Sequence, residues 1–398
     1  MVGEKGKGID SKSGEFFKDA RRSGAWPEAE AVHRSAVTKA RKKISWEVFK
    51  DLLKKAVSLA YELWPDDPDC LWHGLSVYAT DGSKYTLPSA KEIREKYDPE
   101  SGLGHPGKGH FPMCLVSTLY DVFRRLPIAR TVVGIPEANE REQAKKFLPC
   151  FPNPTKSVWL FDQGYPSFEL IHYLLDNFLG YFIFRCPASN SFPVIAAFIR
   201  SGRKEFTIWI TPSNKYLSKL PAAERKNCRP IMLRIIRLTH PDGKVSVLLT
   251  NLYGKKTFSR NEITNLYFRR WNIETYYRDE KVVLEIEKFH AKSVNGILQE
   301  LYAIMIMGVI SRILMALSAD KFCSGSQELQ FKNAILTLAS DAAALVPDDP
   351  AKAVEIFNDI LLEISRVKYY RPQQPRPSQP RFTKKAINKW QTKTSRHA

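Results

Sequence analysis

Several features that would define the class of this protein at once are missing from the chain. Its 398 residues include few cysteines, and none of them forms a CxxC pair. They are Cys70, Cys114, Cys150, Cys186, Cys228 and Cys323. This spacing argues against a zinc module or a disulfide scaffold and favours a reducing compartment. The N-terminal sequence lacks the apolar stretch of a signal peptide, so we do not expect export.

Long uninterrupted hydrophobic runs are also missing. The most apolar stretch is Leu301 to Leu317, but Ser311 and Arg312 interrupt it and Glu300 precedes it. A charged residue inside a membrane-spanning segment is costly, so this stretch predicts a buried core helix. We therefore expect no membrane partner.

Acidic residues are too few to balance the basic ones. The chain has 61 Lys and Arg against 42 Asp and Glu, which gives a net charge of +19. Ten of these basic residues and no acid lie between Arg366 and the C-terminus, in a segment interrupted by prolines. Such an excess favours a polyanionic partner, because each base placed against a phosphate releases a counterion. We interpret the tail as a mobile basic arm, and an inert solvated end is the alternative.

Periodicity predicts a mixed α/β protein between two helical regions. Residues 15–64 have apolar positions at helical spacing, with a stripe of Val48, Leu52, Leu53, Ala56, Leu59 and Ala60. The basic run at 41–43 is either a DNA contact or a solvated helix end. Strands are predicted at 75–81, 111–122, 128–135, 157–162 and 180–186, with helices at 139–148 and 166–177.

A second β-rich segment follows the first. Its predicted strands are 205–210, 230–238 and 244–250, and an Asp-Gly pair at Asp242 suits a tight turn between the last two. Ser259 and Glu262 have the spacing of a capping box and open a helix that is predicted to run to about Phe289. The resulting divisions are 1–70, 71–195, 196–258, 259–320, 321–365 and 366–398.

Two aspartates follow predicted strands and precede glycines. Asp81 precedes Gly82, which we expect to turn the chain, and Asp162 precedes Gly164 in DQGY. Carboxylates at the ends of neighbouring strands can converge on a hard cation such as Mg²⁺. For each aspartate alone, a turn or helix-cap role is the alternative.

The helix after Ser259 carries a polar stripe. At about 100° per residue, its members fall within an arc of roughly 80°. They are Tyr267, Arg270, Glu274, Arg278 and Lys281. Such a stripe is costly to bury, so it should face a cleft that holds metal and phosphates. A solvated helix face with pairs such as Glu274 with Arg278 is the alternative.

These residues carry a family resemblance. The pattern Tyr-x2-Arg-x3-Glu-x6-Lys, present at Tyr267, Arg270, Glu274 and Lys281, resembles the signature of the DDE transposases of insertion-sequence family four (IS 4-like). Asp81 in DGS and Asp162 in DQGY are similar to the first two acidic motifs of that family. The resemblance extends from about Leu71 to Arg312.

The resemblance implies a ribonuclease H-like catalytic core with a β-rich insertion before its last helix. It also implies that Asp81, Asp162 and Glu274 are catalytic and bind two Mg²⁺ ions, for which Mn²⁺ can substitute. Tyr267, Arg270 and Lys281 would contact DNA phosphates, and we add Arg278 from the same stripe. Metal ions held in this way activate a water or a 3′-hydroxyl, so no covalent enzyme nucleophile is needed.

Two weaker features remain. The loop 104–110, GHPGKGH, lacks the P-loop pattern, and a hairpin connection is the simpler interpretation. Trp209 is a candidate for stacking on a flipped base, and a core position is the alternative.

The function implied by the resemblance is that of a DNA transposase. It would bind terminal inverted repeats, cleave the DNA there and join the ends to target DNA as a homodimer. The expected setting is the cytoplasm of a prokaryotic cell, at the nucleoid. The alternatives are a ribonuclease H-like nuclease without strand transfer and a catalytically silent DNA-binding derivative.

Overall fold

A computed structural model describes most of the chain. The described residues are 9–24, 26–63, 68–101, 110–188, 192–239, 243–324, 327–341 and 349–370. Most of the loop at 104–110, the turn that contains Asp242 and the basic tail from residue 371 onward lie outside them. All six cysteines are described and are free thiols.

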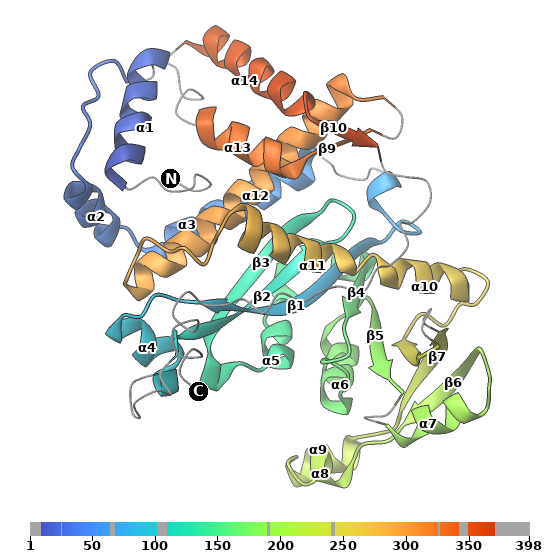
Figure 1. Cartoon of the computed structure of the whole chain (residues 1–398). Coiled ribbons are helices and arrows are strands. Elements are labelled where there is room, and N and C mark those ends of the chain that lie inside the picture. Colours follow the sequence, from blue (N-terminus) through green and yellow to red (C-terminus); the bar gives the residue numbers. More distant parts are fainter. Residues whose placement is uncertain are drawn as a thin grey trace, which may run out of the picture.

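One mixed sheet of eight strands forms the centre of the molecule (Figure 1). Its order is β3-β2-β1-β4-β5-β8-β7-β6. The strands are β1 (Ser76–Thr86), β2 (Met113–Asp121), β3 (Leu126–Gly134), β4 (Ser157–Phe161), β5 (Tyr181–Pro187), β6 (Glu205–Ile210), β7 (Ile231–Thr239) and β8 (Val245–Thr250). The neighbours β1, β4 and β5 run parallel, and every other neighbouring pair is antiparallel. The sequence predicted all eight strands, because buried strands are apolar runs bounded by turns.

The second β-rich segment does not form a separate sheet. Its last strand, β8, pairs with β5 from Ile183↔Thr250 to Pro187↔Ser246, and β7 and β6 follow outward. The central sheet therefore continues through the segment 196–258, and β6 forms one of its edges.

Helices cover both faces of this sheet (Figure 1). One face packs against α3 (Trp46–Leu63), α5 (Glu140–Lys145), α6 (Phe168–Asn177) and α7 (Pro193–Arg200). The other face packs against α4 (Lys91–Tyr97), α10 (Arg260–Phe268) and α11 (Trp271–Arg278). The short helices α8 (Asn214–Leu217) and α9 (Ala222–Asn227) connect β6 to β7.

The long helix α12 (Val294–Phe322) joins these layers to the C-terminal helices. Its side chains enter both sheet cores, and its later turns pack against α13 (Phe331–Asp341) and α14 (Pro350–Ser365). A short ribbon of β9 (Gln327–Leu329) and β10 (Lys368–Tyr370) closes this region. The helix is long and apolar enough to cross a membrane by composition, but 56% of its most apolar window is buried inside the protein. The prediction of a buried core helix at 301–317 is confirmed.

The N-terminal region is helical, as predicted, but its apolar stripe was partly wrong. It consists of α1 (Ile9–Ser23), α2 (Arg34–Lys43) and α3. On α3 the buried residues are Leu53, Val57 and Ala60. Val48, Leu52 and Leu59 are instead exposed. The reason is that α3 packs against α12 and β3 along a narrow row, so the outer half of the predicted stripe faces away.

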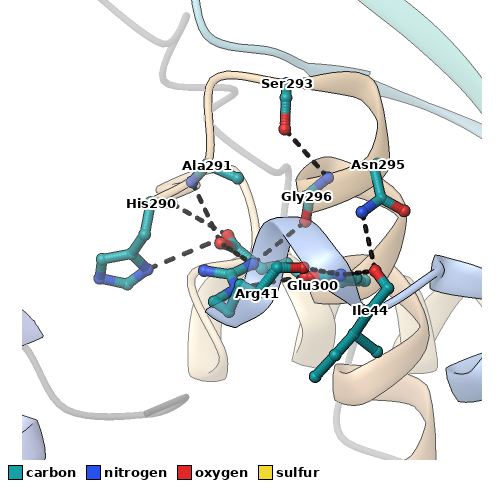
Figure 2. A network of polar contacts seen from close by, with 9 residues as sticks. Arg41, Ile44, His290, Ala291, Ser293, Asn295, Gly296 and Glu300 are labelled. Carbon is teal, nitrogen blue, oxygen red and sulfur yellow. Dashed lines mark hydrogen bonds and ion pairs between the residues drawn. The ribbon is translucent and has the colours of Figure 1, made fainter. Parts of the chain in front are cut away.

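A polar network fixes the corner between α2 and α3 to the start of α12 (Figure 2). The Arg41 guanidinium donates to the Glu300 carboxylate at 3.0 Å and to the Gly296 carbonyl at 3.3 Å. Glu300 also accepts from the backbone N–H groups of His290 and Ala291. Neither interpretation of the basic run applies to Arg41, because its side chain is bound within the protein.

The helix that begins at Ser259 is capped as predicted but is not continuous. Ser259 and Glu262 form the capping box. At Arg269 and Arg270 the backbone N–H groups bond to carbonyls three residues back, which separates α10 from α11. A single π-helical turn, Asp279–Val283, then follows α11. The prediction of one helix to Phe289 was wrong, because these changes of pitch leave no periodic signal in the sequence.

Candidate active site

Asp81 and Asp162 lie side by side where two parallel strands stop pairing. The ladder between β1 and β4 ends at Thr80↔Phe161, and each aspartate is the next residue. Asp81 is not at a strand end, however, and Gly82 does not turn the chain as expected. Strand β1 continues to Thr86 because it remains paired with β2, with Asp81 opposite Thr118. The site is therefore at the end of the parallel ladder and not at the end of β1.

Burial is the main influence on the pKa of the Asp81 carboxyl group. It raises the pKa of the carboxyl group to about 7, with smaller contributions from the charges of Glu140 and Asp162. The positive charge of Arg270 and a hydrogen bond from the Gly82 backbone act in the opposite direction. A carboxylate in such surroundings gains much from a nearby cation.

Asp162 is surrounded by donors from three elements. The Tyr267 hydroxyl of α10 donates to its Oδ1 at 3.2 Å. Arg270 Nη2 lies 3.6 Å from its Oδ2, and Arg185 Nη1 of β5 lies 3.7 Å from its Oδ1. The side chain is 27% exposed, so it can still reach a ligand.

Arg270 connects Asp162 to Glu274. Its Nη2 donates to Glu274 Oε1 at 2.6 Å, while Glu274 remains 31% exposed. The Arg270 side chain is only 2% exposed, and its Nε and Nη1 have no hydrogen-bond partner among the described residues. Two carboxylates of the predicted triad therefore share one guanidinium.

The remaining predicted site residues are more dispersed. Lys281 lies on the π-helical turn, donates to the Lys84 carbonyl at 2.6 Å and lies over the Tyr85 ring. Arg278 is exposed, and within the described part of the chain it forms no ion pair with Glu274, which binds Arg270 instead. Trp209 on β6 is 60% exposed, which excludes a core position.

A buried ion pair holds the end of α11 against the sheet. Glu280 is paired with Arg130 of β3 at 2.5 Å, and both side chains are buried almost completely. Tyr85 of β1 and Tyr276 of α11 also donate to the Glu280 carboxylate. Arg130 further donates to the Leu301 carbonyl of α12 at 3.0 Å. This network fixes the helix that carries Glu274 relative to the strand that carries Asp81.

Three contributors to the site were not predicted from the sequence. Arg185 contacts Asp162, the Tyr277 hydroxyl donates to the Asp81 carbonyl at 2.7 Å, and Glu140 acts electrostatically on Asp81 and Asp162. Tyr277 lies within the signature segment, three residues after Glu274, and that was the available signal. Arg185 and Glu140 lie outside every motif.

The donor set suits a hard divalent cation, although no ready-made ligand cluster is formed. Asp81, Asp162 and Glu274 supply carboxylate oxygens, which Mg²⁺ and Mn²⁺ prefer. Among the described residues, no three acidic, His or Cys side chains are grouped closely enough to hold a metal ion together. The Arg270 guanidinium lies against both Asp162 and Glu274, so a cation bound by these two carboxylates would replace its contacts.

Comparison with known proteins identifies the family. Residues 72–310 match the family described as "Transposase DDE domain", a span that contains every residue discussed above as a predicted site residue. The chain belongs to the DDE transposase family. Members of this family generally use divalent metal ions. The function predicted from the signature residues is therefore confirmed at the level of a DNA transposase.

One curated relative of this DDE transposase is the transposase InsG of insertion sequence element IS4 from Escherichia coli (strain K12). The two are 22% identical over 333 residues, which cover 83% of this chain and 72% of the relative. The predicted resemblance to insertion-sequence family four is confirmed. A solved structure, a piggyBac transposase synaptic complex with hairpin DNA, aligns with a TM-score of 0.42 and 11% identity. That alignment covers 72% of this chain and 57% of the other.

Proposed function

We propose that this transposase has a ribonuclease H-like core and that Asp81, Asp162 and Glu274 form its metal-binding triad. The observation that supports the proposal is the register of β1 and β4, which places Asp81 beside Asp162 at the end of their ladder. Glu274 joins them through the guanidinium that it shares with Asp162. When bound, two Mg²⁺ ions, or Mn²⁺ in their place, would activate a water or a 3′-hydroxyl and stabilise the leaving oxygen.

Arg270 is the residue that we assign to the scissile phosphate. Its Nε and Nη1 have no partner within the described chain, and each can form a two-donor fork to phosphate oxygens together with Nη2 once that nitrogen is released. A cation at Asp162 and Glu274 would compete with Nη2 for the same oxygens. Metal binding would therefore free the guanidinium for the DNA.

Tyr267, Lys281 and Arg278 are assigned to neighbouring phosphates. Tyr267 orients Asp162, and Lys281 adds a positive charge next to Lys84 on β1. Arg278 is exposed and open to a longer-range contact. Trp209 is far more exposed than a core residue, which is compatible with stacking on a flipped base.

The DNA substrate is proposed to be the terminal inverted repeats of the element, followed by target DNA. A net charge of +19 favours such a polyanion. Two ends must be held for joint insertion, so we expect a homodimer in the DNA complex. The N-terminal helices are our candidate for end recognition, and the basic tail would add nonspecific phosphate contacts at the nucleoid.

The decisive experiment combines cleavage and binding. Purified protein is incubated with DNA carrying the element's ends and with Mg²⁺ or Mn²⁺, and cut and joined strands are separated on a denaturing gel. Asp162→Asn should abolish both products while DNA affinity stays within about twofold, because the substitution keeps shape and removes a charge. Asp176→Asn, an exposed aspartate on α6, is the matched control and should be fully active. Full activity of Asp162→Asn would contradict the triad.

The same gel separates the transposase from a nuclease on the same fold. Cut DNA without joined molecules, under conditions in which both ends and target are present, would favour a nuclease without strand transfer. Binding without any cut would favour the silent derivative.

A further inference from the structure

Glu140 is an acidic residue whose carboxylate lies against the backbone of Gly82 and Gly164, the glycines that follow the two aspartates of the site. It is the first residue of α5, which packs on the same sheet. Its Oε1 lies 2.6 Å from the position that a Cβ atom would take at Gly82, and its Oε2 lies 3.6 Å from the corresponding position at Gly164. Gly82 directly follows Asp81, and Gly164 is two residues after Asp162. The Glu140 carboxylate is thus inserted between the two chain segments that carry the aspartates.

Glycine at position 82 makes this approach possible. A Cβ atom there would lie 2.6 Å from Glu140 Oε1 and 3.0 Å from a methyl group of Leu115, so the Glu140 side chain would have to move away. We expected Gly82 to turn the chain, but β1 passes straight through it. Its role is instead to let an acidic side chain from another element reach the backbone beside Asp81.

Within the described residues, Glu140 has no structural partner that would explain its position. Within the described chain it forms no ion pair or hydrogen bond through its side chain, whereas Glu142, on the same helix, is paired with Lys145 at 2.7 Å. The charges of Lys84 and Arg141 act on it only at longer range. Burial, followed by the charge of Asp162, raises the pKa of Glu140. A half-buried acid beside two other acids destabilises the fold unless a cation joins them.

Tyr165 provides an independent observation at the same place. Its side chain is 1% exposed, and its hydroxyl has no hydrogen-bond partner among the described residues. The charges of Glu140, Asp81 and Asp162 all act on this hydroxyl, in that order of strength. Buried hydroxyls are almost always bonded, so a buried hydroxyl that is near enough to feel these three charges and has no partner in the described chain is a donor available to a ligand or to a water molecule.

Charge balance points in the same direction. Two divalent ions carry four positive charges, whereas the proposed triad supplies three negative ones. Arg270 adds a further positive charge, so before the DNA phosphate is bound a fourth carboxylate offsets part of the excess positive charge in a partly buried site, where uncompensated charge is expensive.

We propose that Glu140 is a fourth carboxylate of the divalent-cation site formed by Asp81, Asp162 and Glu274, and that the Tyr165 hydroxyl is its hydrogen-bond donor there. This inference rests on the proposed function. It extends the site from one face of the sheet to the other, because α5 and α11 lie on opposite faces.

The test measures Mn²⁺ binding directly, by the loss of the free-ion electron paramagnetic resonance signal during titration of the full-length chain without DNA. The variants are Glu140→Gln and Tyr165→Phe. Asp162→Asn serves as the control for the proposed function, and Glu137→Gln, an exposed acid three residues earlier, is the matched control. Thermal unfolding in EDTA checks the fold of each variant.

We expect Glu140→Gln to weaken Mn²⁺ binding by about 10- to 100-fold and Tyr165→Phe to weaken it several-fold, as for residues that support metal ligands. Asp162→Asn should weaken it more, and Glu137→Gln should leave it unchanged. Glu140→Gln should not lower the unfolding temperature in EDTA, because it removes a repelled charge. Tyr165→Phe keeps the ring packing against Phe161 and loses a hydroxyl that has no partner among the described residues.

The outcomes separate the two proposals. If Asp162→Asn weakens binding and Glu140→Gln binds like the unmodified chain, the inference about Glu140 is wrong and the triad stands. If the unmodified chain and Asp162→Asn bind Mn²⁺ equally weakly, both proposals are overturned. If Glu140→Gln does not fold, the Tyr165→Phe variant becomes the test. An Mn²⁺ affinity of Tyr165→Phe equal to that of the unmodified chain would overturn the inference.

Discussion

Glu274 and Glu280 lie six residues apart on one helical segment, yet their surroundings are opposite. Glu280 is 1% exposed and accepts from Arg130, Tyr85 and Tyr276, so its charge is fully paired. Glu274 is 31% exposed, and among the described residues its one partner is Arg270, whose guanidinium has two nitrogens without partners there. A buried polar cluster whose atoms are all paired within the chain stabilises the fold. A cluster that keeps unpaired polar atoms is available to bind a ligand.

A Glu→Gln substitution should mainly affect stability at position 280 and mainly affect DNA cleavage at position 274. Glu280→Gln leaves the Arg130 guanidinium buried without its counter-charge and should lower the free energy of unfolding by about 3–5 kcal/mol. Glu274→Gln should leave it within about 1 kcal/mol of the unmodified chain and abolish DNA cleavage. Denaturant unfolding and the strand-cleavage gel measure the two effects.

A double variant tests the physical reason. Glu280→Gln combined with Arg130→Met removes both charges but keeps an acceptor for the Tyr85 and Tyr276 hydroxyls, so it should recover most of the lost stability. If the double variant is as unstable as Glu280→Gln, the ion pair is not the cause.

Asp81 should show the second-largest effect, and it should depend on pH. Burial raises its pKa to about 7 in the folded chain, while the unfolded carboxyl titrates near 3.9. Its contribution to stability is therefore fully present below about pH 4 and is lost as pH rises to about 7. Asparagine does not ionise, so Asp81→Asn does not lose this stability as pH rises. At pH 8 in EDTA, the melting temperature of the variant should therefore exceed that of the unmodified chain by a few degrees. The difference should shrink toward pH 4, and a constant difference at all pH values would contradict the assignment.

The smallest effect on stability is expected for the polar network between α2 and α12 shown in Figure 2. Its polar groups are paired within the chain, but the network is partly exposed to solvent. Arg41→Ala removes the ion pair with Glu300 and the hydrogen bonds to Gly296 and Gln299. Because the side chain is 26% exposed, we expect a loss of about 1–2 kcal/mol in unfolding free energy. Lys42→Ala, an exposed neighbour in the same basic run, should change it by less than about 0.5 kcal/mol. Equal effects of the two would mean that the network contributes nothing specific.

Features set by local patterns could be predicted from the sequence. Strand β4 is entirely buried, so its residues read as a short apolar run, and Ser259 with Glu262 gave the true start of α10. Asp81, Asp162 and Glu274 were predicted as site residues from a family resemblance, and their role stays a prediction. Their actual neighbours Arg270 and Tyr267 belong to the same signature.

Features set by tertiary pairing could not be predicted. Asp81 was expected at a strand end because Asp-Gly is typical of turns, but pairing with β2 carries β1 onward. Arg130 and Glu280 are 150 residues apart, and nothing local to either indicates the other. Glu140 appears as an ordinary acid at a helix start, and only the glycine opposite it reveals where its carboxylate lies.

The continuation of the central sheet through β8, β7 and β6 determines which strand is open to pairing with another chain on this side of the sheet. Without these strands β5, which carries Arg185, would be the open edge of the sheet, and an open edge recruits strands from other chains. Three added strands move that edge about 14 Å away from the carboxylates, at roughly 4.8 Å per strand. The inserted segment therefore keeps β5 from unwanted β-pairing, and on this side of the sheet any such pairing would occur at β6, away from the proposed site.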